Sequence, residues 1–243
     1  MQIVKLHTID STNDYLKRES KLGNISKDTL AWAKYQSQGR GQMGTSWQSE
    51  KESNLTFSIY RKSRRLSVGN QCYITMAASL AVYDALDKLM LKKISVKWPN
   101  DIMSDRKKIA GILIESVIKS NTLDAVIIGI GLNVNQTNFE NLPKATSIKE
   151  QLGIHFHLEE ILQLLISQFH TYARSITSGD FASIKAAYED RLYRKDKPST
   201  FQRSNGEQFV GIIRGVNTSG QLILEEEDQI LNTYNLKELS LLF

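Results

Sequence analysis

Two different spacings of hydrophobic residues divide the chain into predicted strands and helices. Apolar, β-branched and aromatic residues alternate or run together in five segments, which predict strands: 29–35, 54–61, 94–98, 108–118 and 123–134. Apolar residues recur at helical spacing in three segments, which predict helices: 73–90, about 158–175 and about 181–192. Capping residues in DSTNDYLK, residues 10–17, predict one more helix. The pattern therefore indicates a central sheet with helices packed on it, followed by a long polar loop over 135–150.

The pattern changes to short strands after Pro198. Asn205-Gly206 and Ser219-Gly220 are hairpin signals between alternating segments, and they predict a small β-barrel. A charged run at 195–198 separates the last predicted helix from these strands. We therefore expect two domains, a larger one over 1–194 and a smaller one over 195–243.

The composition is that of an ordinary globular protein. Of the 243 residues, 41% are hydrophobic and 23% are charged, which argues against disorder. The longest apolar runs are far shorter than the roughly 20 residues that cross a bilayer, and the N-terminus lacks the pattern of a secretion signal. The single cysteine, Cys72, cannot form an internal disulfide. We therefore predict a cytoplasmic protein that does not associate with a membrane.

The net charge of +5 leaves several kinds of partner open. A nucleic acid, an anionic substrate and a soluble surface all agree with it. The basic cluster RKSRR at 61–65 is consistent with a solvated turn or with an anion contact. The four histidines show no metal-ligand spacing, so no zinc site is expected.

The glycine-rich stretch QSQGRGQMGTSW, residues 36–47, lies between two predicted strands. Glycines allow a tight turn with positive φ, so geometry alone could require them here. A dinucleotide-binding fingerprint would need the glycines to open a helix after a strand, and a P-loop would need a G-K-[ST] sequence. Neither condition is met, so we exclude both nucleotide-binding motifs.

The segment KWPNDI, residues 97–102, is a more specific signal. It places a cation and a carboxylate, Lys97 and Asp101, a few positions apart at the end of a predicted strand. Lys108 opens the next predicted strand, and Gly111 follows in the same strand. One lysine at a strand start is usually only solvated. Two lysines on neighbouring strands that face a glycine loop suggest an anion-binding site.

Five stretches, taken in order, resemble the biotin protein ligases, which join biotin to a lysine of a carboxylase carrier domain. They are DSTNDYLK, YQSQGRGQMGTSW, KWPNDI, KKIAGILIE and IIGIGLNVN. The resemblance covers nearly the whole chain and implies an α+β fold. It implies a mixed sheet with flanking helices, related to class II aminoacyl-tRNA synthetases, and a small C-terminal SH3-like β-barrel. It also implies ATP and Mg²⁺ as cofactors, biotin as substrate, a biotinyl-5'-AMP intermediate and a biotin carboxyl carrier protein as partner.

The same resemblance assigns roles to individual residues. Those that it places at the biotin are Ser11, Thr12, Asn13, Gln36, Gly39, Arg40, Gly41, Lys108 and Gly111. Those that it places at the nucleotide are Arg40, Trp47, Lys97, Trp98, Asn100, Asn133 and Arg214, the last of which reaches toward the site from the barrel. The catalytic residues that it implies are Lys108, Arg40, Lys97 and Asp101. Asp101 is also the candidate Mg²⁺ ligand, because Mg²⁺ binds one or two carboxylates together with phosphate oxygens and water.

The glycine-rich loop departs from the family pattern, which usually reads G-R-G-R-x-G-[RK]-x-W. Gln42 stands in place of the second arginine, and Thr45 in place of the later basic residue. If those cations help to retain the activated intermediate, this protein holds it less firmly or draws positive charge from elsewhere, for example from Lys34.

Three alternatives are weighed against a biotin protein ligase. A lipoate ligase or octanoyltransferase would share the fold and the lysine, but its loop would not usually read GRGQMG and be followed by KWPND. A biotin-sensing repressor would carry a DNA-binding domain before the ligase motifs, which here begin at about residue 8, so we expect no DNA binding and no repressor role. A binding module without catalysis would tolerate loss of Lys108. The carboxylase that is modified and a possible homodimer are left open.

Overall fold

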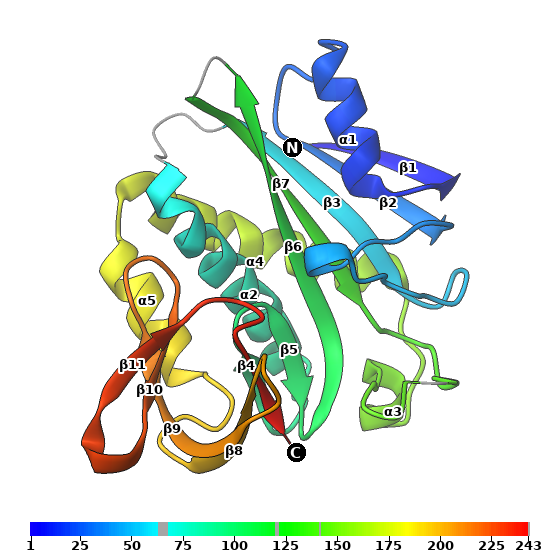
Figure 1. Cartoon of the computed structure of the whole chain (residues 1–243). Helices are drawn as coiled ribbons and strands as arrows, with labels where there is room; N and C mark the ends of the chain where they lie inside the picture. Colours follow the sequence, from blue (N-terminus) through cyan, green and yellow to red (C-terminus); the bar gives the residue numbers. More distant parts are fainter. Residues whose placement is uncertain (63–67, 120–121, 141, 243) are drawn as a thin grey trace.

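The computed structural model describes residues 1–62, 68–119, 122–140 and 142–242. Most of the basic cluster at 61–65 lies outside the described residues, so its prediction stays open. A seven-stranded sheet forms the centre of the molecule (Figure 1). Its strands, in spatial order, are β1 (Gln2–Ile9), β2 (Thr29–Gln36), β3 (Leu55–Lys62), β7 (Thr122–Leu132), β6 (Lys107–Lys119), β5 (Asp101–Ser104) and β4 (Ile94–Lys97). β1 and β2 are parallel and the other pairs are antiparallel, so the predicted mixed sheet is confirmed.

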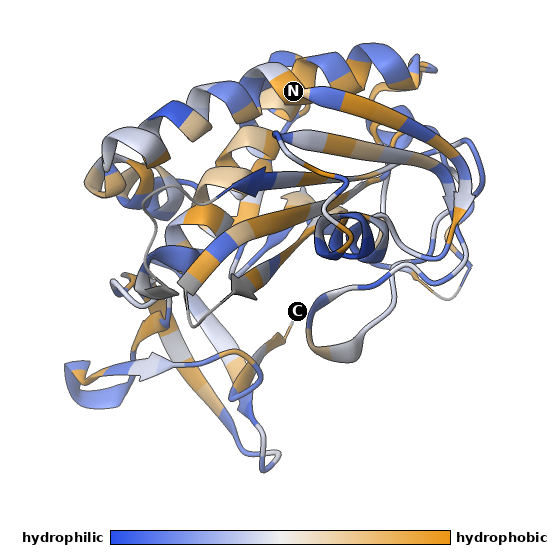
Figure 2. Cartoon of the chain, turned by 90° about the horizontal axis from the view of Figure 1, so that it is seen from above, coloured by the Kyte–Doolittle hydropathy of each residue, from blue (hydrophilic) through white to orange (hydrophobic). Residues whose placement is uncertain are grey.

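Helices cover both faces of this sheet (Figure 1). Those that pack on one face are α2 (Gln71–Lys88), α4 (Leu158–Ser178) and α5 (Phe181–Asp190). The other face carries α1 (Thr12–Lys21). Side chains alternate between the two faces of a strand. In β7, accordingly, Val126 and Ile128 join the larger core, whereas Ile127 packs with Leu16 of α1. Hydrophobic and hydrophilic residues alternate along the covering helices, as this burial requires (Figure 2).

A second sheet of five antiparallel strands follows the helices. Its strands, in spatial order, are β11 (Leu231–Tyr234), β10 (Leu222–Glu225), β9 (Gln208–Val216), β8 (Pro198–Arg203) and β12 (Leu239–Leu242). Both predicted hairpins are present, between β8 and β9 and between β9 and β10. The predicted SH3-like barrel is not confirmed, because no ladder among the described residues pairs β11 with β12 to close the sheet. The domain boundary at 194 stays a prediction.

Two short elements differ from the sequence prediction. β5 lies between the predicted strands 94–98 and 108–118, where no strand was predicted, and it separates β4 from β6. Lys97 and Lys108 are therefore not on neighbouring strands, which corrects that prediction. The predicted loop over 135–150 ends in a helix, α3 (Ile148–Leu152), whose N-cap is Ser147. Both elements have only four or five residues, too few to show a period.

Short 3-10 turns complete the secondary structure, at Gln42–Gly44, Val68–Asn70 and Glu227–Gln229. The first of these lies in the glycine-rich loop. None of the described helices combines the length and the apolar character needed to cross a membrane. The predicted cytoplasmic location stays a prediction.

The second sheet is joined to the first through hydrogen bonds at the KWPND turn. The indole Nε1 of Trp98 donates to the carbonyl oxygen of Gly220, 2.9 Å away. The hydroxyl of Tyr188 in α5 donates to the carbonyl oxygen of Pro99, 2.8 Å away. Glu189 of the same helix accepts from the backbone N–H of Val216 at 2.8 Å. The turn between β4 and β5 is thus held from both sides.

Candidate active site

A cavity of about 390 Å³ lies between the large sheet, the glycine-rich loop and the second sheet. We call residues 36–47 the flap, because they cover this cavity. Most of the predicted site residues line it: Ser11, Thr12, Asn13, Gln36, Arg40, Gly41, Trp47, Lys97, Trp98, Asn100, Asp101, Lys108 and Gly111. Gly39, Asn133 and Arg214 are not among the lining residues. The resemblance therefore identified the walls of one pocket, with three exceptions.

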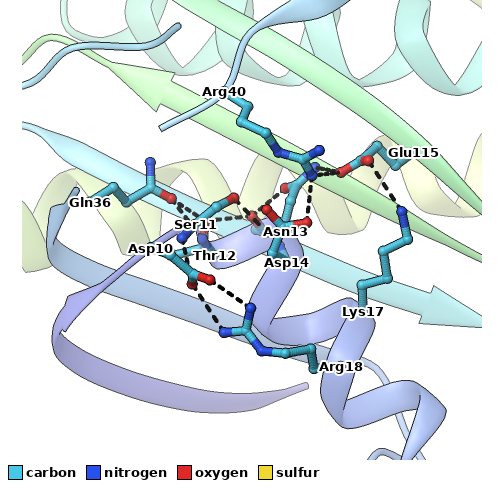
Figure 3. A network of polar contacts seen from close by, with 11 residues as sticks. Asp10, Ser11, Thr12, Asn13, Asp14, Lys17, Arg18, Gln36, Arg40 and Glu115 are labelled. Carbon is cyan, nitrogen blue, oxygen red and sulfur yellow. Dashed lines mark hydrogen bonds and ion pairs between the residues drawn. The ribbon is translucent and has the colours of Figure 1, made fainter. Parts of the chain in front are cut away.

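A corner of polar side chains lines part of the pocket, and most of its contacts are drawn in Figure 3. Ser11 caps α1, and the oxygen of its side chain accepts from the backbone N–H of Asp14. Thr12 donates from its backbone N–H to Oε1 of Gln36 at 2.7 Å, and its hydroxyl lies 2.6 Å from that of Ser58. Ser58 donates to Oδ1 of Asn13 at 2.5 Å. We call Ser11, Thr12, Asn13, Gln36 and Ser58 the polar corner.

Arg40 ties the flap to α1 and β6. Its Nη2 lies 2.7 Å from Oδ1 of Asp14 and 2.8 Å from Oε2 of Glu115 (Figure 3). The amide of Asn13 donates to the same oxygen of Glu115 at 2.7 Å. Glu115 therefore links the flap arginine to the polar corner. This network fixes the base of the flap beside the polar corner.

A cluster of cations around Asp101 lines another part of the pocket. Nζ of Lys108 lies 2.6 Å from Oδ1 of Asp101, and β4 pairs Lys97 with Asp101 in register. Burial lowers the pKa of Lys97; Asp101 opposes this shift, whereas repulsion by Lys108 and Lys144 adds to it. The cluster thus holds more positive than negative charge, which suits an anionic ligand.

The floor of the pocket is made of glycines under the ring of Trp47. A Cβ added at Gly131 would overlap that ring, and one added at Gly111 would meet it at 3.2 Å. Nζ of Lys108 lies 5.6 Å from the centre of a Trp47 ring, within the range of a cation–π contact. The flap therefore reaches the sheet through Trp47, and the absence of side chains at the floor makes room for it.

Two predicted residues support the site from outside its lining. Gly39 lies at the base of the flap, where an added Cβ would overlap the carbonyl oxygen of Trp47. Asn133 is buried and donates to the carbonyl oxygen of Thr146 at 2.9 Å. The backbone N–H of Thr146 in turn donates to the carbonyl oxygen of Lys108 at 3.0 Å. Asn133 is thus linked through Thr146 to the strand of Lys108, and its place at the nucleotide stays a prediction.

Arg214 forms ion pairs outside the pocket lining, and its role at the nucleotide stays a prediction. Its Nη1 lies 2.6 Å from Asp196, and its Nε lies 2.8 Å from Glu225. Both partners belong to the C-terminal part of the chain, and the guanidinium does not line the pocket. The resemblance matched the residue by its position along a strand, whereas the direction of its side chain depends on these two carboxylates.

Lys34, named as a source of compensating charge, forms an ion pair with Glu52 at 3.0 Å and does not line the pocket. Among the described residues, no group of three or more His, Cys, Asp or Glu side chains could hold a metal ion. Asp101 is the only acidic side chain among the described lining residues. A Mg²⁺ ion at this site would therefore take one protein carboxylate and draw its other ligands from phosphate oxygens and water.

The fold and the pocket together define an α+β protein with a small cavity beneath a glycine-rich flap. The chain is similar in structure to the biotin protein ligase from Aquifex aeolicus in complex with biotin and ATP. The TM-score is 0.83 at 26% sequence identity, and the match covers 99% of this chain and 98% of that one.

The model of the Biotin/lipoate A/B protein ligase family matches residues 6–133, and the chain belongs to this family. It is 31% identical over 203 residues to biotin--[acetyl-CoA-carboxylase] ligase from Paracoccus denitrificans, across 80% of this chain and 83% of the relative. It is 28% identical over 233 residues to the bifunctional ligase/repressor BirA of Bacillus subtilis, across 94% of this chain and 71% of the relative. The predicted family and the predicted enzyme class, a biotin--[acetyl-CoA-carboxylase] ligase, are confirmed.

Proposed function

We propose that this protein activates biotin with ATP and transfers it to one lysine of a biotin carboxyl carrier domain. The observation that carries the proposal is that one pocket joins the polar corner to the cluster of Lys97, Asp101 and Lys108. The first would receive the ring of biotin, and the second the carboxylate and the nucleotide. The proposed activity involves ATP, Mg²⁺ and a carrier domain, and it involves no DNA.

The polar corner favours biotin over an aliphatic acid such as lipoate. Ser11, Thr12, Asn13 and Ser58 of this corner are buried, and buried polar groups are hydrogen-bonded. The ureido ring of biotin can both donate and accept hydrogen bonds there. An aliphatic chain offers neither, and a site built for hydrogen bonds strongly rejects a ligand that lacks them. The wider family includes both kinds of ligase, so this corner is where we place the choice between them.

In the first step a carboxylate oxygen of biotin attacks the α-phosphorus of ATP, and pyrophosphate leaves. Two anions must approach each other, and their repulsion is the main barrier that the protein can lower. A pair of unit charges 4 Å apart at an effective dielectric of 20 interacts by about 4 kcal/mol. Lys108, Lys97 and Arg40 can therefore each contribute on this scale by positioning and by charge. Mg²⁺, held by Asp101 and phosphate oxygens, would supply further charge neutralisation.

In the second step the lysine amine of the carrier attacks the acyl carbon, AMP leaves, and the amine loses a proton. We assign that proton to Asp101, the acidic side chain of the pocket lining. Water would hydrolyse the mixed anhydride before transfer. The flap, which reaches the sheet through Trp47, therefore has the second task of excluding solvent from the intermediate.

The proposal is tested by biotin-dependent exchange of pyrophosphate into ATP. We expect exchange with biotin and Mg²⁺, and at least 100-fold less with lipoate at the same concentration, because lipoate lacks the ureido groups that would hydrogen-bond with the polar corner. Equal exchange with both acids would contradict the assignment of the polar corner. No exchange with either acid would contradict the first step itself.

The lowered pKa of Lys97 predicts an early alkaline limit of activity. An ordinary lysine has a pKa near 10.4, and Lys97 loses its positive charge below that value, so kcat/KM for biotin should fall as pH rises through the lowered pKa. In Lys97→Arg the charge persists, and the alkaline limb should move to higher pH. Superimposable pH profiles for the two proteins would show that Lys97 does not act through its charge.

The neutral flap predicts weak retention of the intermediate. Gln42 and Thr45 both line the pocket, where the family pattern has cations. Gln42→Arg should therefore slow the dissociation of biotinyl-5'-AMP by about tenfold, since a charged hydrogen bond contributes on the order of 1.5 kcal/mol or more. The measurement is the release of labelled intermediate from preloaded protein. Equal rates in the wild type and in Gln42→Arg would contradict the hypothesis.

A further inference from the structure

One side chain of the C-terminal part of the chain contacts the flap at the pocket lining. Nζ of Lys237 donates to the carbonyl oxygen of Met43, 3.1 Å away, although the two residues are 194 positions apart in the chain. Both residues line the cavity. Lys237 precedes β12 and Met43 lies at the centre of the 3-10 turn Gln42–Gly44. The contact therefore joins the second sheet directly to the tip of the flap.

The backbone on both sides of this contact is unusual. Met43 has φ 52° and Lys237 has φ 70°, and both values lie in the left-handed region that residues other than glycine seldom adopt. Such conformations persist where surrounding contacts hold them, and they often mark clamps over ligands. The side chain of Met43 is 59% exposed and contributes little packing to hold the tip down. The hydrogen bond to its carbonyl group does so instead.

The chemistry of the contact suits a latch. Its acceptor is a main-chain carbonyl group, so the bond does not depend on which side chain stands at position 43. Its donor is an ammonium group, which makes stronger hydrogen bonds than a neutral donor does. None of the carboxylates that the structure describes forms an ion pair with Lys237. The ammonium group thus donates its hydrogen bond to the flap. The flap residues Gln42 and Thr45 carry no charge themselves.

We propose that Lys237 is a positioning residue that latches the flap over the pocket and thereby prolongs retention of the acyl-adenylate. The proposal rests on the proposed ligase function for the identity of the intermediate. The latch itself is a property of the protein without ligand. A sheet outside the catalytic sheet therefore sets how often the flap opens.

The test removes the donor and keeps the stem of the side chain, in Lys237→Met. Lys237→Arg restores a charged donor, and Lys197→Met is the matched control, because Lys197 is an exposed lysine of the same part of the chain outside the pocket lining. The first readout is the rate at which trypsin cuts after Arg40 in the protein without ligands, followed by the mass of the fragment 1–40. The second is the release of biotinyl-5'-AMP from preloaded protein.

We expect Lys237→Met to be cut after Arg40 five to ten times faster than the wild type, and to release the intermediate faster by a similar factor. Lys197→Met should match the wild type, and Lys237→Arg should recover most of the protection. The latch would be overturned if trypsin cut Lys237→Met after Arg40 no faster than the wild type. It would also be overturned if trypsin cut Lys197→Met as fast as Lys237→Met. If the wild type formed no adenylate, the proposed function would fail, whereas the trypsin comparison would still decide the latch.

Discussion

Lys108→Met lowers the rate of biotin-dependent pyrophosphate exchange by about 1,000-fold in our account. The substitution keeps an unbranched side chain of similar reach and removes the ammonium group. A charge interaction of about 4 kcal/mol at 4 Å corresponds to a factor of about 10³ in rate. The loss should appear in kcat, because the repulsion that Lys108 offsets grows as the carboxylate approaches the phosphorus.

The matched control for this change is Lys107→Met. Lys107 is the neighbouring residue in β6, it is exposed, and it does not line the pocket. The variant Lys107→Met should keep a rate of pyrophosphate exchange within about twofold of the wild type, because surface substitutions usually have small effects. Exchange by Lys108→Met within tenfold of the wild type would contradict the role of Lys108. It would then favour a binding module over an enzyme that activates biotin.

Gly131→Ala should reduce transfer about 100-fold while the protein stays folded. The added methyl group would overlap the ring of Trp47, so the flap must lift from the floor of the pocket. Displacement of a positioning element by about 1 Å can lower a rate by about 10²-fold. The strand itself should tolerate alanine, so the midpoint of thermal unfolding should change little.

Gly211→Ala is the control for this prediction. An alanine methyl group there would meet its nearest neighbours at 3.5 Å, an ordinary contact. Both variants can be compared by transfer rate and by the fluorescence of Trp47, after replacement of the other tryptophans if needed. Wild-type transfer by Gly131→Ala would show that the floor does not set the position of the flap.

The start of α1 could be predicted from local rules, whereas the place of its first residues at the ligand was implied only by the resemblance. Ser11, Thr12 and Asn13 begin α1, and short polar residues are favoured at a helix N-terminus. The flap was also predictable, since its glycines lie between two segments with clear strand patterns. The near-continuous burial of β3 and β7 was equally accessible, since apolar and β-branched residues run through both segments. Each of these features depends mainly on residues that are close together in the sequence.

The residues that contact these elements from distant parts of the chain could not be predicted from the local sequence pattern. Ser58 reaches the polar corner because β3 packs beneath α1, and Gly131 matters because Trp47 folds onto it. A signal for the second did exist, since Gly129 and Gly131 alternate within a β-branched strand and glycine there often marks a close approach. The observed partners of Asn133 and Arg214 were not predicted either, because each lies on another segment of the chain.

The most direct test is transfer to a carrier. The protein is incubated with ATP, Mg²⁺, biotin and an unmodified biotin carboxyl carrier domain, and the intact mass of the carrier is measured. The control is the same domain with arginine in place of the acceptor lysine. We predict that the first carrier gains the mass of one biotinyl group, only when ATP is present, and that the control gains none. An unchanged mass of the first carrier would contradict the assignment of this protein as a ligase.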